Sequence, residues 1–271
     1  MPTVFGKNSI ASWSTRFAAA VADLVLPRTC AACGAAIGLE EADLCTSCAI
    51  ELQAAVTGIY CRHCGEDRGD YLLHDGRCTR CVTKKPRPGF EAFARVGRYE
   101  ASLKAVVLRF KREFFLDRFL GRLLGGAIRG RIDPAQVDLW VPIPSHWRRR
   151  LSVGYQPAAL LAGAAVRAWR GRVTPALAMT RYVPPFHLQQ GMSAAERAEA
   201  VAGAFAVVEA DAVKDSSICL IDDVTTTGAT LSEARRALQK AGAKWVAAAV
   251  LAKTSRHGPA SGGVDRSSAA R

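Results

Sequence analysis

The sequence of 271 residues lacks any apolar run near the ~18 residues that a membrane-spanning helix needs. It also lacks a secretory signal pattern. The apolar stretch 14–26 is interrupted by Arg16 and Asp23, and no Ala-x-Ala-like site follows it. We therefore expect an amphipathic N-terminal helix within residues 1–27 and a cytoplasmic protein.

An excess of acidic residues is absent too, since the formal net charge is +13. Residues 1–94 hold equal numbers of acidic and basic side chains, so the whole positive excess lies after them. Such a charge suits a polyanionic ligand, either a nucleic acid or a pyrophosphate-bearing sugar. A solvated basic surface has the same composition, and charge alone does not separate these three interpretations.

Eight of the nine cysteines form four Cys-x-x-Cys pairs. Two intervening residues let one tight turn direct both sulfurs at a single tetrahedral ion. The segment repeats itself: a pair followed by Gly34 or Gly65 is each time succeeded by a Cys-Thr-x-Cys pair. The repeat favours two sites made of sequential pairs, with a cross-braced arrangement as the alternative. The ligands would be Cys30, Cys33, Cys45 and Cys48 in one site and Cys61, Cys64, Cys78 and Cys81 in the other.

Zinc is favoured over two other uses of these cysteines. Disulfides need an oxidising compartment, which no targeting signal supports, and iron–sulfur clusters usually show other spacings. Residues 28–89 hold few large apolar side chains, so metal coordination would supply folding free energy that a core cannot. We predict two structural zinc ions in a double zinc ribbon at 28–85, which would lower the net charge to about +9. Cys219, in an apolar run, is interpreted as a core residue.

A lysine- and proline-rich linker at 84–89 precedes alternating strand and helix patterns. The patterns predict an α/β domain at 90–252 with a mostly parallel sheet and flanking helices, then a disordered tail at 253–271. The expected strands begin at Phe93 and span 137–141, 176–179, 218–221 and 245–251. The expected helices span 101–112, about 114–128 and about 157–170, and a further helix begins at Ser193.

The most informative stretch is 218–231, where an apolar run predicts a buried strand that ends at Asp222 and Asp223. A hydroxyl-rich loop with one glycine follows, and then a helical pattern. A strand, a tight loop and a helix N-terminus present unpaired N–H groups and positive potential to a phosphate. Two carboxylates beside a phosphate make sense if they accept hydrogen bonds from a diol such as ribose. An ordinary strand followed by a capped helix is the alternative.

This stretch resembles the phosphoribosyl-pyrophosphate (PRPP) motif of type I phosphoribosyltransferases. The resemblance implies that Asp222 and Asp223 hold the ribose hydroxyls and that Mg²⁺ accompanies the pyrophosphate. It implies that the 5′-phosphate is held by the loop residues Thr225, Thr226, Thr227, Gly228, Ala229 and Thr230.

A second loop follows the predicted strand 137–141 and resembles the pyrophosphate-binding loop of the same enzymes. Its residues are Pro142, Ile143, Pro144 and Ser145. Ligands of parallel sheets bind at the carboxyl ends of strands, so both loops are expected at one edge. Arg149 and Arg150 are further candidates for pyrophosphate binding, and the alternative is that they are solvent-exposed.

The cysteine pairs, linker, PRPP motif and length together resemble the competence protein F (ComF) family, from about Leu26 to Leu251. Its members combine a double zinc ribbon with a phosphoribosyltransferase domain and are linked to DNA uptake. The resemblance implies PRPP, single-stranded DNA and a DNA-uptake helicase or other competence protein as partners. The chain departs from the family at Gln156-Pro157, where Asn-Gln is usual, and at Ala200, where an Asn is common.

Three functional hypotheses follow from this resemblance. The first is a phosphoribosyltransferase that displaces pyrophosphate from ribose C1 with an unknown nitrogenous acceptor. The second is a non-catalytic PRPP- or nucleotide-binding module that handles single-stranded DNA. The third is a zinc-ribbon adaptor with a relic domain, which an intact PRPP motif argues against. No catalytic general base can be identified in the sequence.

Overall fold

The computed structural model describes residues 28–38, 43–68, 73–83, 89–145, 154–180 and 193–254. The expected N-terminal helix, most of the linker, Arg149 and Arg150, and the tail beyond Thr254 lie outside these residues. None of the helices in the described ranges is both long and apolar enough to cross a bilayer.

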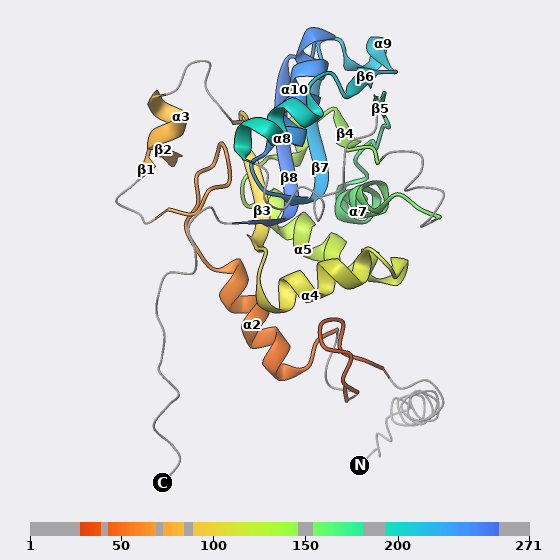
Figure 1. The fold of residues 1–271 in the computed structure, drawn as a ribbon. Coiled ribbons are helices and arrows are strands. Elements are labelled where there is room, and N and C mark those ends of the chain that lie inside the picture. The colour runs from red at the N-terminus through yellow and green to blue at the C-terminus, as the bar shows by residue number, and fades with distance from the viewer. Residues whose placement is uncertain are drawn as a thin grey trace, which may run out of the picture.

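A four-stranded parallel sheet forms the centre of the molecule (Figure 1). The interior position of the strand that carries Asp222 and Asp223, and the parallel sheet itself, confirm the predicted fold class. Strands of such sheets are buried on both faces and are therefore apolar almost throughout. In spatial order the strands are β3 (Phe93–Arg98), β8 (Trp245–Lys253), β7 (Ser217–Thr225) and β4 (Leu139–Pro142).

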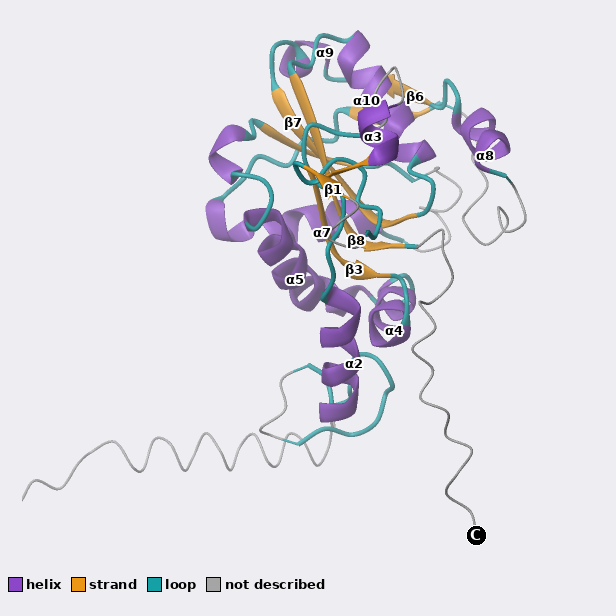
Figure 2. Ribbon diagram, turned by 90° about the vertical axis from the view of Figure 1, so that its left-hand side faces the viewer, coloured by secondary structure: helices purple, strands orange, loops and turns teal. Residues whose placement is uncertain are grey.

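Helices cover both faces of this sheet (Figures 1 and 2). Alternate residues of β7 enter two separate cores: Cys219 and Ile221 one of them, Ile218 and Leu220 the other. The first core is covered by α4 (Ala101–Phe110), α5 (Asp117–Arg129) and α7 (Pro157–Val166). The second is covered by α10 (Ala229–Lys240) and an antiparallel pair, β5 (Leu177–Met179) with β6 (Phe205–Val207).

The remaining elements connect these layers. The capping box predicted at Ser193 is present, because its Oγ accepts from the Glu196 amide at 3.2 Å and Glu196 Oε2 accepts from the Ser193 amide at 2.5 Å. The connecting elements are α8 (Ala194–Val201), α9 (Ala210–Val213) and 3₁₀ turns at Phe114–Leu116, Pro134–Gln136 and Arg167–Trp169.

Two predicted strand ends are wrong by a few residues. β7 does not end at Ile221, since Asp222, Val224 and Thr225 still pair with β8. β8 likewise includes Lys253, the residue at which the tail was expected to begin. The two strands continue to pair with each other beyond their apolar runs. The carboxyl edge of the sheet therefore lies at Thr225 and Lys253.

The cysteine-rich region contains α2 (Thr46–Val56), β1 (Leu73–His74), β2 (Arg77–Cys78) and α3 (Thr79–Thr83). Its two halves attach at different places. Leu52 and Ala55 of α2 join the first core, whereas Asp67 of the second half pairs with Arg95 of β3. Figure 1 shows α2 beneath α4, and β1, β2 and α3 at the left of the view, away from α2.

Candidate functional site

The eight paired cysteines converge into two groups of four, and within each group the sulfurs all lie within 4.8 Å of one another. The sequential pairing is confirmed and the cross-braced alternative is wrong. The groups are Cys30, Cys33, Cys45 and Cys48, and Cys61, Cys64, Cys78 and Cys81.

The sequence repeat is also a repeat of backbone structure. The amide of Gly34 donates to the Cys30 carbonyl at 2.9 Å, and the amide of Gly65 donates to the Cys61 carbonyl at 2.8 Å. Both glycines have positive φ, 78° and 70°, a conformation that favours glycine. We name these two halves, residues 28–56 and 57–83, the first and second ribbons.

The sulfur geometry fits zinc. Four sulfurs about 2.3 Å from a central ion form a tetrahedron with edges of about 3.8 Å. Cys33 and Cys45 sulfurs are 3.8 Å apart, and those of Cys64 and Cys78 are 3.7 Å apart. Hydrogen bonds with Cys64 and Cys81 lower the pKa of Cys61, and hydrogen bonds with Cys61 and Cys64 raise the pKa of Cys81. A dication lets all four ionise, so these are structural zinc sites with every position taken by protein.

The loop between β7 and α10 joins the end of a strand to the N-terminus of a helix, as predicted. Gly228 caps α10 with φ 80° and ψ 11°, and a Cβ at this position would meet nothing within 4 Å. Thr227 Oγ1 accepts from the Ala229 amide at 3.4 Å. The next amides, of Thr230 and Leu231, are in the first turn and have no partner within the helix. The loop therefore presents N–H groups and a hydroxyl beside open space.

The two carboxylates are half-buried at the end of β7. Asp222 and Asp223 each accept from the following amide through Oδ1, at 2.8 and 2.6 Å. The second oxygen of Asp223 lies 3.0 Å from Lys111 Nζ, at the end of α4. Tyr99 is part of the same cluster: burial raises its pKa and the Asp223 charge adds to that, while the Lys111 charge opposes it.

The proline-containing loop lies directly beside the acid pair. Pro142 pairs with Ile221, and the Ile143 amide donates to the Ile221 carbonyl at 2.9 Å. The Ile143 carbonyl in turn accepts from Gln156 Nε2 at 3.3 Å. Pro144 and Ser145 follow, both half-buried. The structure thus brings together every described residue of the two predicted loops at one edge of the sheet.

Sequence reasoning missed Tyr99 and Lys111. Each follows an element whose own pattern was predicted, β3 and α4 respectively. Tyr155 lies near this end of α4, where its hydroxyl donates to the Phe110 carbonyl at 2.5 Å. No local motif marks these residues, and the signal that was available is their position at the carboxyl ends of a parallel strand and of a helix.

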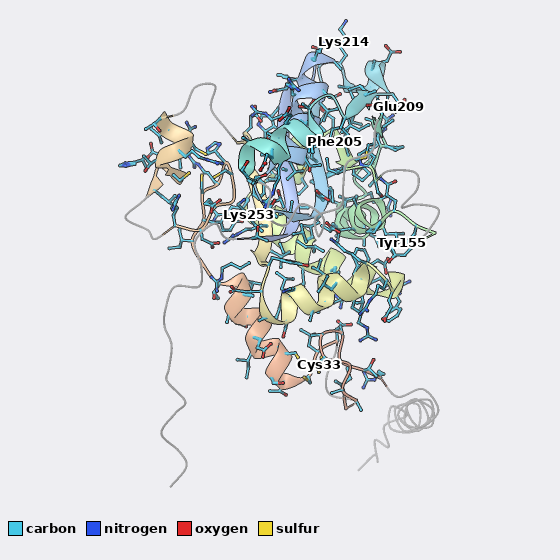
Figure 3. The ribbon with its side chains drawn as sticks, in the orientation of Figure 1. Cys33, Tyr155, Phe205, Glu209, Lys214 and Lys253 are labelled. Carbon is cyan, nitrogen blue, oxygen red and sulfur yellow. The ribbon has the colours of Figure 1, made fainter. Side chains whose placement is uncertain are left out.

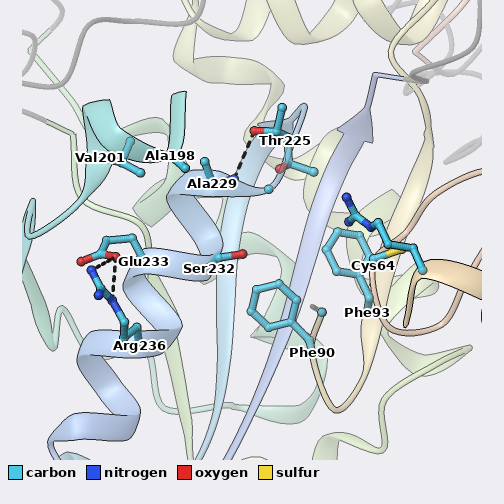
Figure 4. A pocket seen from close by; sticks show the side chains of 14 residues that line it. Cys64, Phe90, Phe93, Ala198, Val201, Thr225, Ala229, Ser232, Glu233 and Arg236 are labelled. Atoms are coloured by element: carbon cyan, nitrogen blue, oxygen red, sulfur yellow. Dashed lines mark hydrogen bonds and ion pairs between the residues drawn. The ribbon is translucent and has the colours of Figure 1, made fainter. Parts of the chain in front are cut away.

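A cleft of about 380 Å³ borders the loop between β7 and α10 (Figure 4). It lies between α8, α10 and the second ribbon, with Phe90 and Phe93 forming an apolar wall. On its α10 side Glu233 accepts from Arg236 at 2.9 and 2.6 Å and from the Gly203 amide at 2.8 Å. The cleft reaches the loop at Thr225, Thr227, Gly228 and Ala229.

Comparison with known proteins agrees with this arrangement. A double zinc ribbon domain family model matches residues 21–82. The chain is similar to competence protein F of Haemophilus influenzae, with 30% identity over 219 residues, 79% of this chain and 91% of that protein. It is also similar to the DNA utilization protein YhgH of Salmonella typhi, with 29% identity over 244 residues, 85% of this chain and 99% of that protein.

Among solved structures, the glutamine PRPP amidotransferase of B. subtilis shares 16% identity with a TM-score of 0.32. The match covers 49% of this chain and 25% of that one, so this chain spans about a quarter of its length. We assign the fold class from the parallel sheet and not from this match. Because the chain covers nearly all of a relative that is 30% identical, the predicted membership is confirmed, and the chain belongs to the competence protein F family.

Proposed function

We propose that this protein binds PRPP at the carboxyl edge of its sheet and transfers the phosphoribosyl group to a nitrogenous acceptor. One observation carries the proposal: β4 pairs with β7 up to its own last residue, Pro142, which lies beside Ile221, the residue before Asp222. That pairing brings three features to one place: a phosphate loop at 225–230, two carboxylates and a proline-containing loop. PRPP carries a 5′-phosphate for the first, a diol for the second and a pyrophosphate for the third.

Different residues of the site would bind different groups of PRPP. Asp222 and Asp223 accept hydrogen bonds from the ribose hydroxyls, which are the donors that a carboxylate pair needs. The amides and hydroxyls of 226–230 bind the 5′-phosphate at the start of α10. Lys111, held at 3.0 Å from Asp223, balances the charge of the acid pair and leaves it able to accept from a neutral diol.

Transfer breaks the bond from ribose C1 to the pyrophosphate oxygen and forms one from C1 to nitrogen. Bound Mg²⁺ would neutralise the departing pyrophosphate, and the carboxylate oxygens of this edge are of the hard donor type that suits it. The chain's own contribution is to position the sugar and keep its charges matched. The Pro142–Ser145 loop would hold the pyrophosphate end.

Isothermal titration with PRPP and Mg²⁺ tests the binding step without knowledge of the acceptor. We expect wild-type protein to bind and the double variant Asp222→Asn, Asp223→Asn to bind at least about tenfold more weakly, because two charge-assisted hydrogen bonds are lost. Asp138→Asn is the matched control: Asp138 accepts from the Ser217 amide at 2.8 Å, at the opposite end of β7. Unchanged PRPP affinity in the double variant would show that the assigned site is wrong.

Turnover is a separate question with its own measurement. Pyrophosphate release from PRPP in the presence of candidate bases would establish transfer. Binding without release under any acceptor would instead support a non-catalytic PRPP- or nucleotide-binding module.

Handling of single-stranded DNA is the second candidate function. The net charge of +13 favours it, as do relatives named for competence and DNA utilization. Binding through phosphates weakens linearly in log–log terms as salt rises. A steep salt dependence of single-stranded DNA affinity would support this function, and affinity insensitive to salt would contradict it. A DNA-uptake helicase remains the proposed protein partner.

A further inference from the structure

Lys253 is a charged residue in an unusual place. It ends β8, the strand beside β7, and its side chain is 3% exposed. Lysine is almost never buried without a partner, because removing its charge from water is costly. Figure 3 shows it at the end of β8, on the side of the second ribbon.

The ammonium of Lys253 contacts two parts of the molecule. Its Nζ donates to the carbonyl of Thr226 at 2.6 Å. It also lies 3.5 Å from Oε2 of Glu66, whose side chain is 6% exposed. Thr226 belongs to the phosphate loop, and Glu66 follows Cys64 and Gly65 in the turn of the second zinc site. One buried cation therefore joins a zinc ribbon to the loop.

Backbone pairing reinforces this link. Lys253 pairs with Thr225 across the two strands, and the amide of Thr254 donates to the Thr225 carbonyl at 3.0 Å. Pairing with β8 therefore fixes Thr225, the last residue of β7. The next carbonyl, that of Thr226, accepts from the Lys253 ammonium.

The ribbon end of the link is rigid. Asp67, next to Glu66, pairs with Arg95 of β3 through two hydrogen bonds, one of them 2.9 Å long. The Arg95 side chain is 2% exposed, and its guanidinium lies 4.5 Å from the centre of the Tyr60 ring. A bidentate pair of this kind fixes orientation as well as distance. Glu66 is therefore held in place independently of Lys253.

The first ribbon makes no comparable link within the described residues. Its anchors include Arg109 of α4, which donates to the Cys30 carbonyl at 2.9 Å, and Arg122 of α5, which pairs with Asp43. Arg98 of β3 also donates to a carbonyl of α2, that of Ala54, at 2.9 Å. Both ribbons thus contact β3, but among the described residues the buried link to the loop before α10 comes from the second ribbon.

We propose that Lys253 is a positioning residue through which the second zinc ribbon sets the conformation of the phosphate loop. Its ammonium orients the Thr226 carbonyl away from the ligand side, so that the following amides face a phosphate. The consequence for PRPP rests on the proposed function, whereas the consequence for loop conformation does not.

The test combines two measurements on full-length, zinc-loaded variants. Hydrogen–deuterium exchange of residues 226–232 reports the loop directly, and titration with PRPP and Mg²⁺ reports its use. The variants are Lys253→Met, Lys253→Arg and the double change Glu66→Met, Lys253→Met. The double variant removes both buried charges, a replacement that proteins often tolerate without loss of stability. Arg109→Met is the matched control, because it removes a hydrogen bond that anchors the first ribbon and leaves the second ribbon unchanged.

We expect exchange in 226–232 to rise about tenfold in Lys253→Met and in the double variant, with β7 still protected. PRPP affinity should fall by a similar factor. Lys253→Arg should restore both measures, and Arg109→Met should change neither. Wild-type exchange in the double variant would overturn the inference. If wild-type protein fails to bind PRPP, the proposed function falls, and the exchange measurement still decides the role of Lys253.

Discussion

Gly34 and Gly65 occupy the same turn of the two ribbons with nearly the same φ, 78° and 70°. Their surroundings differ: a Cβ on Gly34 would meet nothing within 4 Å, whereas one on Gly65 would lie 2.4 Å from the Phe93 ring. Gly34→Ala should therefore cost about 1 kcal/mol of backbone strain. Gly65→Ala should cost that and about 1–3 kcal/mol more for overpacking. Chemical denaturation of the zinc-loaded variants measures the difference.

The comparison carries its own control, since the two substitutions share chemistry and backbone conformation. Equal losses of unfolding free energy would mean that Phe93 and the second ribbon do not pack as described. Zinc content should stay at about two per chain in both variants, because neither change removes a ligand.

Single residues were predictable from the sequence where residue type and spacing carry the chemistry. The eight cysteines and the adjacent pair Asp222 and Asp223 met that condition. Lys111 and Lys253 did not, because each acts through a partner far away in the chain, Asp223 for one and Glu66 for the other. Only the folded sheet edge brings such residues together.

At the scale of elements, apolar patterns predicted the strand–loop–helix unit, but not its limits. β7 is longer than its apolar run because β8 continues alongside it through Thr225 and Lys253. α2 was not predicted, since its residues were interpreted only as zinc ligands and their spacers. β6 was missed as well, although its partner β5, which is also three residues long, was predicted.

The turn into α10 gives an element-scale prediction. Gly228 has φ 80° and open space around its missing Cβ, and Gly203, after α8, has φ 67° and is equally open. Alanine at either position should cost about 1 kcal/mol of strain. At Gly228 alone the methyl group would stand where the proposed phosphate approaches, so PRPP affinity should fall about tenfold or more.

Thermal unfolding and titration with PRPP and Mg²⁺, applied to both variants, separate the two effects. Similar melting temperatures with unequal affinities are the expected pattern. A Gly228→Ala protein that binds PRPP as well as Gly203→Ala would place the ligand away from this turn.

On the scale of the whole molecule, the two ribbons repeat in sequence and geometry but serve different parts of the fold. The first packs through Leu52 and Ala55 of α2 against the first core. The second contacts β3 through Arg95 and the end of β8 through Lys253, next to the loop between β7 and α10. The repeat in the sequence predicts the two zinc sites but not this asymmetry, which depends on the surface that each ribbon meets.

Removing one zinc ion at a time tests whether the two ribbons differ in their effect on the loop between β7 and α10. Cys48 and Cys81 are corresponding ligands, both buried and both near the start of a helix. Cys48→Ser and Cys81→Ser should each lower the metal content from about two zinc ions to about one per chain.

In Cys81→Ser the turn that carries Glu66 loses its anchor, so exchange in residues 226–232 should rise and PRPP affinity should fall. In Cys48→Ser both should stay near wild type, because α2 contacts α4 and not the loop. Loss of affinity in both variants alike would mean that zinc supports the fold as a whole and that the second ribbon has no separate hold on the loop.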